Sequence, residues 1–92
     1  MIYINTNLEA INEMLKENLP NVTEDISKAD TIVMSAITQE DIDNIKKLDK
    51  NVFLMISFDL IDYGRSKGFH TFSPGTPIPD VINEIKFFME NT

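Results

Sequence analysis

The 92-residue sequence contains no cysteine, and its three glycines are isolated from one another. The absence of cysteine excludes disulfide bonds, thiolate metal sites and cysteine nucleophiles. Isolated glycines form no Gly-rich loop of the kind that cradles phosphate groups. No apolar run approaches the roughly 20 residues of a membrane span, and the N-terminus lacks the basic start of a signal peptide. We therefore expect a soluble, cytoplasmic protein.

Basic residues are also scarce, since 15 acidic side chains stand against 8 basic ones and the formal net charge is -7. An acidic surface repels DNA, RNA and anionic membranes, so neither nucleic acid nor a membrane is expected as a partner. Mimicry of DNA by arrayed carboxylates is an alternative, but lysines such as Lys16, Lys46 and Lys86 are interspersed among the acids. The hydrophobic fraction of 42% is ordinary for a globular chain, and the length fits one domain over residues 1–92.

Short apolar runs alternate with amphipathic stretches along the chain. The apolar side chains from Leu8 onward fall at helical spacing, with Asn7 as the expected N-cap. Thr38 and Asp41 form a capping-box pair at the start of another helix, and Pro79 suits the first position of the last one. We expect strands at residues 1–5, near 22, and at 31–34, 51–56 and 69–72, and helices over 7–19, from 38, over 58–67 with Gly68 closing it, and from 79.

Strands that are apolar on both faces and alternate with amphipathic helices indicate a parallel sheet that is covered on both sides. Right-handed crossovers then give a small doubly wound α/β fold, a three-layer sandwich with strand order 2-1-3-4-5. The second strand is short, and the helix after it is reduced to a few residues around Lys28. In such a fold, ligands and chemistry are found at the carboxyl ends of the strands.

The side chains at the expected carboxyl ends are small and uncharged. A serine nucleophile needs a positioned base, and the only histidine, His70, falls inside an expected strand. A divalent metal needs converging carboxylates, which these positions lack. We therefore expect no catalytic residue, no metal site and no cofactor, and we interpret the hydroxyls as helix caps and partners of strand-end amides. The residues of this expected pocket are Asn5, Thr6, Ser35, Ser57 and Ser73.

The segment 64–90 resembles the C-terminal third of a response-regulator receiver domain. Gly68 lies before the last expected strand, Pro74 follows that strand, and residues 81–89 form a final amphipathic helix, as in that family. The preceding elements follow the same order, so the resemblance covers nearly the whole chain. It implies the flavodoxin-like fold of receivers.

The sequence departs from the receiver pattern where the chemistry of that family takes place. Receivers carry an acidic pair after the first strand that helps to hold magnesium, and Asn5 and Thr6 stand there in this chain. Ser35 stands in place of the phospho-accepting aspartate, and Ser73 in place of the lysine before the proline, whereas Ser57 keeps the hydroxyl of the family. The resemblance therefore implies a degenerate receiver, or pseudo-receiver, that is not phosphorylated on aspartate and is not an enzyme.

Pseudo-receivers act as docking or dimerisation modules, and some precede ATPase domains. The resemblance thus implies a noncatalytic regulatory module in signalling, with a possible place at the N-terminal side of an ATPase-linked system. We expect it to bind a protein partner or a second copy through its last two helices and last strand, where aromatic side chains gather. The residues of this expected interaction face are Phe58, Tyr63, Phe72 and Phe87.

Besides DNA mimicry, three alternatives stay open. The stretch 62–64 followed by Gly68 is similar to the tail of the cysteine-bearing phosphotransferase subunits, although their cysteine after the first strand is absent, so a small-ligand or phosphotransferase-type module is one of them. A metal role for Glu24, Asp25 and Asp30 is another, although a solvent-exposed loop explains these acids as well. An anion-binding turn at 73–77 is the third.

Overall fold

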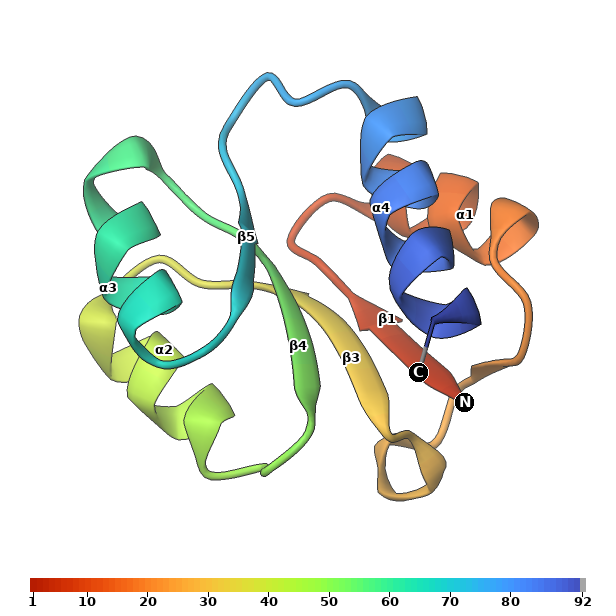
Figure 1. Ribbon diagram of the computed structural model, residues 1–92, viewed down its shortest axis with the longest axis horizontal. Helices are drawn as coiled ribbons and strands as arrows, with labels where there is room; N and C mark the ends of the chain where they lie inside the picture. Colours follow the sequence, from red (N-terminus) through yellow and green to blue (C-terminus); the bar gives the residue numbers. More distant parts are fainter. Residues whose placement is uncertain (92) are drawn as a thin grey trace.

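Five parallel strands form one sheet in the structure, a computed structural model that describes residues 1–91 (Figure 1). The spatial order is β2-β1-β3-β4-β5, which is the doubly wound order expected from the sequence. In the centre of the sheet, Ile4 of β1 pairs with Val33 of β3, and Val33 pairs with Phe53 of β4. The strand ends lie within one residue of the predicted ends. The strands are β1 (Ile2–Asn5), β2 (Val22–Thr23), β3 (Thr31–Ser35), β4 (Asn51–Met55) and β5 (His70–Phe72).

Helices cover both faces of the sheet and complete the expected three-layer sandwich. One layer contains α1 and α4, and the other contains α2 and α3 (Figure 1). A 3-10 helix, η1, takes the place of the helix between β2 and β3, which confirms that this helix is reduced. Within residues 1–91 the helices are α1 (Glu9–Asn18), η1 (Ile26–Lys28), α2 (Gln39–Lys46), η2 (Phe58–Leu60), α3 (Ile61–Ser66) and α4 (Ile78–Glu90).

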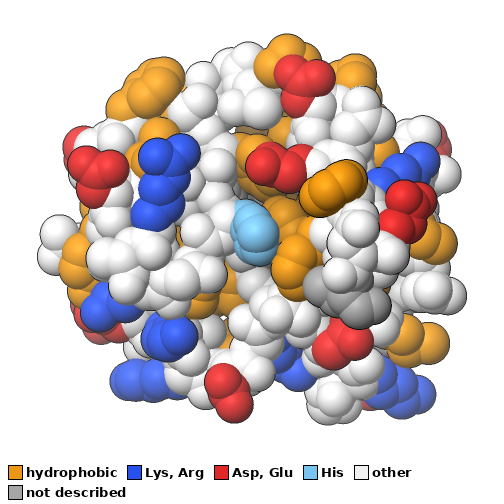
Figure 2. All heavy atoms as spheres, viewed as in Figure 1, with side chains coloured by type: hydrophobic (Ala, Val, Ile, Leu, Met, Phe, Trp, Pro, Cys, Tyr) orange, Lys and Arg blue, Asp and Glu red, His pale blue; other side chains and the backbone are white. Residues whose placement is uncertain are grey.

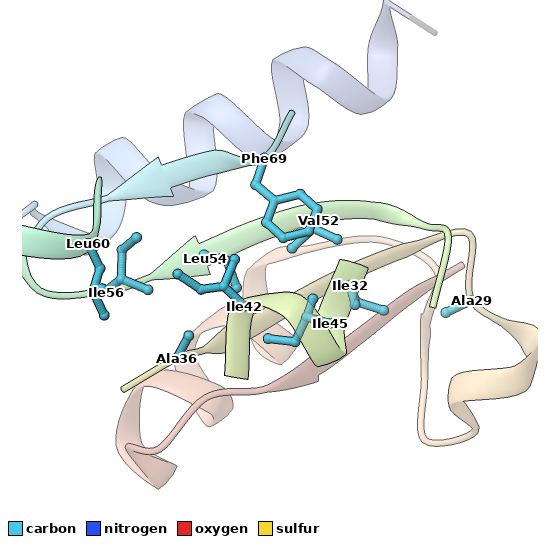
Figure 3. Close-up of a cluster of buried hydrophobic side chains, with 10 residues drawn as sticks. All are labelled: Ala29, Ile32, Ala36, Ile42, Ile45, Val52, Leu54, Ile56, Leu60 and Phe69. Atoms are coloured by element: carbon cyan, nitrogen blue, oxygen red, sulfur yellow. The ribbon is translucent and has the colours of Figure 1, made fainter. Parts of the chain in front are cut away.

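The sheet separates two clusters of buried apolar side chains. On one side, Ile32 and Leu54 of the sheet meet Ile42 of α2 (Figure 3). On the other side, Phe53 lies beneath the layer of α1 and α4. Because successive strand residues alternate between the two faces and both faces are covered, consecutive positions of the central strands are buried, as at 31–33 of β3 and 52–54 of β4. This explains the continuous apolar runs in the sequence.

The start of α1 differs from the sequence prediction. Asn7 was expected as the N-cap, but Leu8 occupies that position and makes no side-chain cap hydrogen bond. The backbone N–H of Asn7 donates to the hydroxyl of Ser35 at 3.1 Å, and that hydroxyl donates back to the Asn7 side-chain oxygen at 3.0 Å. Asn7 therefore connects the ends of β1 and β3 and does not begin a helix.

Two other helix predictions are corrected in detail. The helix predicted over 58–67 is divided into η2 and α3, and α4 begins at Ile78, which puts Pro79 at its second position. Two local predictions are confirmed. Thr38 and Asp41 form the complete capping box of α2, and Gly68 follows α3 with a φ of 85°, a conformation that favours glycine.

Candidate functional site

The carboxyl edge of the sheet, which we define as the connections that follow β1, β3, β4 and β5, contains two adjacent hollows. β1 and β3 are neighbours, but α1 after β1 covers one face of the sheet and α2 after β3 covers the other. A crevice forms where connections diverge in this way, and ligands of doubly wound folds bind there. Asn7 and Ile37 line both hollows, which therefore adjoin each other.

One hollow, most of whose lining residues are polar, has a volume of about 400 Å³ and lies at the ends of β1 and β3. Three residues of the expected pocket, Asn5, Thr6 and Ser35, line it. The charged residue in its lining is Asp41, whose carboxylate accepts hydrogen bonds from the backbone N–H groups of Ile37 at 3.0 Å and of Thr38. This carboxylate is therefore engaged in closing the start of α2.

The apolar cavity has a volume of about 360 Å³ and lies at the ends of β4 and β5, beside the start of α4, towards the top of Figure 1. Ser57 and Ser73 line it, so the five residues of the expected pocket are divided between two hollows. Among residues 1–91, no charged residue takes part in its wall. The lining residues are Asn7, Leu8, Ala36, Ile37, Met55, Ile56, Ser57, Phe72, Ser73, Pro74, Thr76, Ile78 and Val81.

The hydroxyls of the carboxyl edge hold the connections in place. Ser35 exchanges hydrogen bonds with Asn7, as described above. Ser57 donates to the carboxylate of Asp59 at 2.6 Å, and the hydroxyl of Ser73 lies 3.3 Å from another hydroxyl of its own turn. None of these partners is a histidine or a lysine. Ser35 thus accepts from a backbone N–H, whereas Ser57 and Ser73 pair with side chains of their own connections, and Ser57 makes no cap hydrogen bond to η2.

Sequence reasoning missed Asn12, which is 4% exposed and organises the end of β1. Its side-chain oxygen accepts from the backbone N–H of Thr6 at 2.8 Å and from the Thr6 hydroxyl at 2.6 Å, and its amide donates to the Thr6 carbonyl at 3.2 Å. A signal was present in the sequence: position 12 lies four residues after Leu8 and three before Leu15, so it belongs to the inner stripe of the helix. A polar residue in such a stripe needs a buried partner.

The only histidine is confirmed within a strand, and it lies away from the hydroxyls of the carboxyl edge. His70 is the first residue of β5 and pairs with Phe53. Its ring stacks on Phe53 with centroids 4.5 Å apart and meets the ring of Phe88 at 5.1 Å. Figure 2 shows the histidine at the surface, bordered by hydrophobic side chains. Its aromatic contacts indicate a packing role.

The expected interaction face needs a correction at Phe72. This side chain is only 4% exposed, because α4 covers that face of β5 and buries Phe72 with Val81 and Ile85. Phe72 therefore contributes to the core and to the wall of the apolar cavity, and its side chain offers no exposed face to a partner.

The other three residues of the expected face are divided between the two layers, with Phe58 and Tyr63 on η2 and α3 and Phe87 on α4. Tyr63 is half-buried on α3, and its hydroxyl donates to Asp43 at 2.6 Å, which raises the pKa of the tyrosine. Phe58 precedes α3 and is 70% exposed, whereas Phe87 is 68% exposed on α4. Phe87 follows the buried Ile85 by two residues, or about 200° around the helix, so it points away from the sheet.

Large exposed apolar side chains gather instead at the carboxyl edge. Leu8 follows β1, Ile37 follows β3 and Phe58 follows β4, and they are 55%, 73% and 70% exposed. Leu8 and Ile37 line the apolar cavity, and Phe58 comes directly after the lining residue Ser57. Leu8 and Ile37, from two connections that are distant in the sequence, thus give the cavity exposed apolar walls, and Phe58 lies one residue from its lining in a third connection.

The acidic residues before β3 and the turn after β5 have structural partners of their own. Asp25 accepts from the backbone and hydroxyl of Ser27, Asp30 lies 3.3 Å from the N-terminal amine, and Glu24 lies 3.4 Å from Lys16. Within residues 1–91, no group of three histidine or acidic side chains is arranged to hold a metal ion. The turn at 73–77 is closed on itself by hydrogen bonds to the carbonyl of Ser73. No helix in that range is long and apolar enough to cross a membrane.

Replacing Asp41 with asparagine is expected to lower the free energy of unfolding at pH 7, because two backbone N–H groups donate to its carboxylate at the start of α2. These hydrogen bonds lower the pKa of Asp41 below its ordinary value of 3.8. A depressed pKa stabilises the folded protein above pH 3.8, and this stabilisation is lost as the pH falls through the folded-state pKa. Urea unfolding of wild type and Asp41→Asn across this range should show their difference shrinking below pH 3.8.

A difference in stability that stays constant down to the lowest pH would contradict this explanation. It would mean that the amide disturbs the capping box by its shape and not by its missing charge.

Comparison with known proteins adds no relative. A scan against protein-family models, a search of curated proteins and a search of solved structures each returned no match to this chain. The function must therefore be argued from the geometry of the carboxyl edge.

Proposed function

We propose that the protein is a noncatalytic module that binds a protein partner through the carboxyl edge of its sheet. The observation that carries this proposal is the exposure of Leu8, Ile37 and Phe58 around an uncharged apolar cavity. Contiguous exposed apolar surface marks interaction sites, and a cavity beside it offers a place for an anchoring side chain. The proposal keeps the binding role inferred from the sequence but moves it from the last two helices to the carboxyl edge.

The pseudo-receiver relationship is part of this proposal. The strand order is that of a flavodoxin-like fold, and Asn5 at the end of β1 and the buried Thr6 after it stand in place of an acidic pair. Ser35 stands in place of the phospho-accepting aspartate, and its hydroxyl donates a hydrogen bond to the side-chain oxygen of Asn7. We propose that the fold serves regulation, in a signalling or ATPase-linked system, without aspartyl phosphorylation. Treatment with a small phosphodonor and magnesium should leave the mass of the protein unchanged, and a phosphorylated species would refute this part.

Photo-crosslinking tests where the partner binds. Ile37, Phe58 and Phe87 are each replaced with p-benzoylphenylalanine, and cells that express each variant are irradiated. We expect a discrete crosslinked product from positions 37 and 58 and none from position 87, whose similar exposure of 68% makes it a matched control. Products from position 87 alone would place the interface on α4. The absence of a product from all three positions would refute the binding role.

A second candidate function is supported by the volume of the apolar cavity. At about 360 Å³ it reaches the lower end of the range of small-molecule pockets, and its wall is apolar with a few hydroxyls and amides. A small, neutral, mainly apolar ligand fits this lining. A ligand at about 100 times its dissociation constant would add roughly 2.7 kcal/mol to the stability. A rise in Tm that is lost in Ile37→Gln would support this candidate, and an unchanged Tm across a set of neutral compounds would remove it.

A further inference from the structure

Charge is distributed unevenly between the two edges of the sheet. Each α-helix begins at the carboxyl edge, and its first turn contains at least one acidic side chain, as does η2. The connections and first turns that form this edge contain no lysine, arginine or histidine. The acidic residues are Glu9, Glu40, Asp41, Asp59, Asp62 and Asp80.

All 8 basic residues are found elsewhere in the chain. Each of them lies in the second half of an α-helix, or in a segment that leads back into a strand at the opposite edge of the sheet. The residues are Lys16, Lys28, Lys46, Lys47, Lys50, Arg65, Lys67 and Lys86. Within the described residues, no cation lies among the six carboxylates of the carboxyl edge, and their charge exceeds the roughly half positive charge at the N-terminus of each of the four α-helices, so the net charge of this edge is negative.

The apolar cavity at the same edge of the sheet has no charged residue in its wall among residues 1–91. The exposed side chains of Leu8 and Ile37 in that wall extend its apolar surface outward, with the exposed Phe58 next to the lining residue Ser57 in sequence. An occupant that satisfies both features needs an apolar side chain to enter the cavity and positive charges around it. A basic amphipathic segment has this combination on its surface.

We propose that the carboxyl edge binds a basic amphipathic segment of a partner protein, with an apolar side chain in the cavity and Lys or Arg side chains beside the surrounding carboxylates. This inference rests on the proposed function and names the chemistry of the partner. A second copy that pairs through its own carboxyl edge is the poorer occupant, because the carboxylates of the two copies would face each other. Charge complementarity therefore decides between these occupants.

Peptides of defined charge test the inference. The probe is a fluorescein-labelled peptide of about 18 residues made of leucine and lysine, with leucines at i, i+3, i+4 and i+7 spacing. Its counterpart has glutamate in place of every lysine. Fluorescence anisotropy gives Kd for each peptide at about 50 and 300 mM NaCl. We expect the basic peptide to bind, with weaker binding at the higher salt concentration, and the acidic peptide not to bind.

Matched variants test whether the binding takes place at the carboxyl edge. Ile37→Gln should weaken binding of the basic peptide about tenfold or more, whereas Leu48→Gln, an exposed apolar position after α2, should not change Kd. Both positions are at the surface, and thermal unfolding followed by circular dichroism confirms that each variant is folded.

Paired charge variants test the role of the carboxylates. Asp59→Asn combined with Asp80→Asn should weaken binding about three- to tenfold and reduce its salt dependence. Asp49→Asn combined with Glu90→Gln removes the same charge away from the carboxyl edge and should leave Kd unchanged. Asparagine tolerates the positive φ of 54° at position 49, so this control keeps its fold.

The outcomes separate this inference from the proposed function. Three results would each contradict the proposal of a basic partner. They are equal affinity for the acidic peptide, an unchanged Kd in Ile37→Gln, and a dimer in sedimentation that Ile37→Gln dissociates. If neither peptide binds but positions 37 and 58 still crosslink, the partner chemistry is wrong and the proposed function stands. If those positions do not crosslink either, both fail.

Discussion

Replacing Phe53 with alanine is expected to lower the free energy of unfolding by about 3–5 kcal/mol. The Phe53 side chain has no exposed surface and lies in the middle of β4. Its ring centroid is 4.5 Å from that of His70, 6.1 Å from that of Phe72 and 5.4 Å from that of Phe88. Truncation removes all three ring contacts and leaves a cavity that the sheet cannot close. Since domains are stable by only about 5–15 kcal/mol, much of the stability would be lost.

Urea unfolding followed by far-UV circular dichroism measures this effect. Phe87→Ala is the matched control, because it removes the same side chain from a position that is 68% exposed, and its effect should stay within about 0.5 kcal/mol. Similar losses in the two variants would contradict the assignment of Phe53 to the centre of the core.

Replacing Asn12 with alanine is expected to destabilise the protein by about 1–3 kcal/mol. The variant leaves the buried backbone N–H of Thr6 without the acceptor that now lies 2.8 Å away. The Thr6 hydroxyl can still donate to the carbonyl of Leu8, so most of the cost comes from the backbone N–H and carbonyl of Thr6, which both lose their partner. The connection that carries Leu8 should become more mobile, and hydrogen exchange at the Thr6 amide should become faster.

Asn18→Ala provides the control on the same helix. Its side-chain amide donates to the carbonyl of Met14 at 2.7 Å, but at an exposed position, so the expected change is within about 0.5 kcal/mol. If both asparagine variants lost the same stability, the helix itself and not the buried hydrogen bonds would be responsible.

The order of the elements could be predicted from the sequence because each central strand is buried on both faces. Such burial requires continuous apolar runs, as in residues 52–54, and these runs are visible without knowledge of the fold. The capping box of α2 was predictable for a similar reason, since both of its members, Thr38 and Asp41, lie within one turn. Interactions that are local in the sequence leave a local signal.

The interaction face was not predictable in the same way. The exposure of Phe72 depends on how far α4 reaches over β5, and no pattern within the strand encodes that distance. The lining of the apolar cavity comes from all four connections of the carboxyl edge, and Leu8, Ile37 and Phe58 are separated by 29 and then 21 residues along the chain. Only the fold brings them together. The burial of Asn12 could have been predicted from the helical period, but its hydrogen-bond partner, Thr6, is known only from the structure.

The two ends of the described chain meet at one residue. The backbone N–H of Thr31 donates to the carbonyl of Met1 at 3.4 Å, and the Thr31 hydroxyl donates to the sulfur of Met89 at 3.7 Å. Thr31 is the first residue of β3, so this meeting point lies at the end of the sheet opposite the apolar cavity (Figure 1). A fluorophore or an immobilisation tag attached at either end would therefore project away from the carboxyl edge. A molecule tethered in this way would expose its carboxyl edge, with the apolar cavity, to the solution.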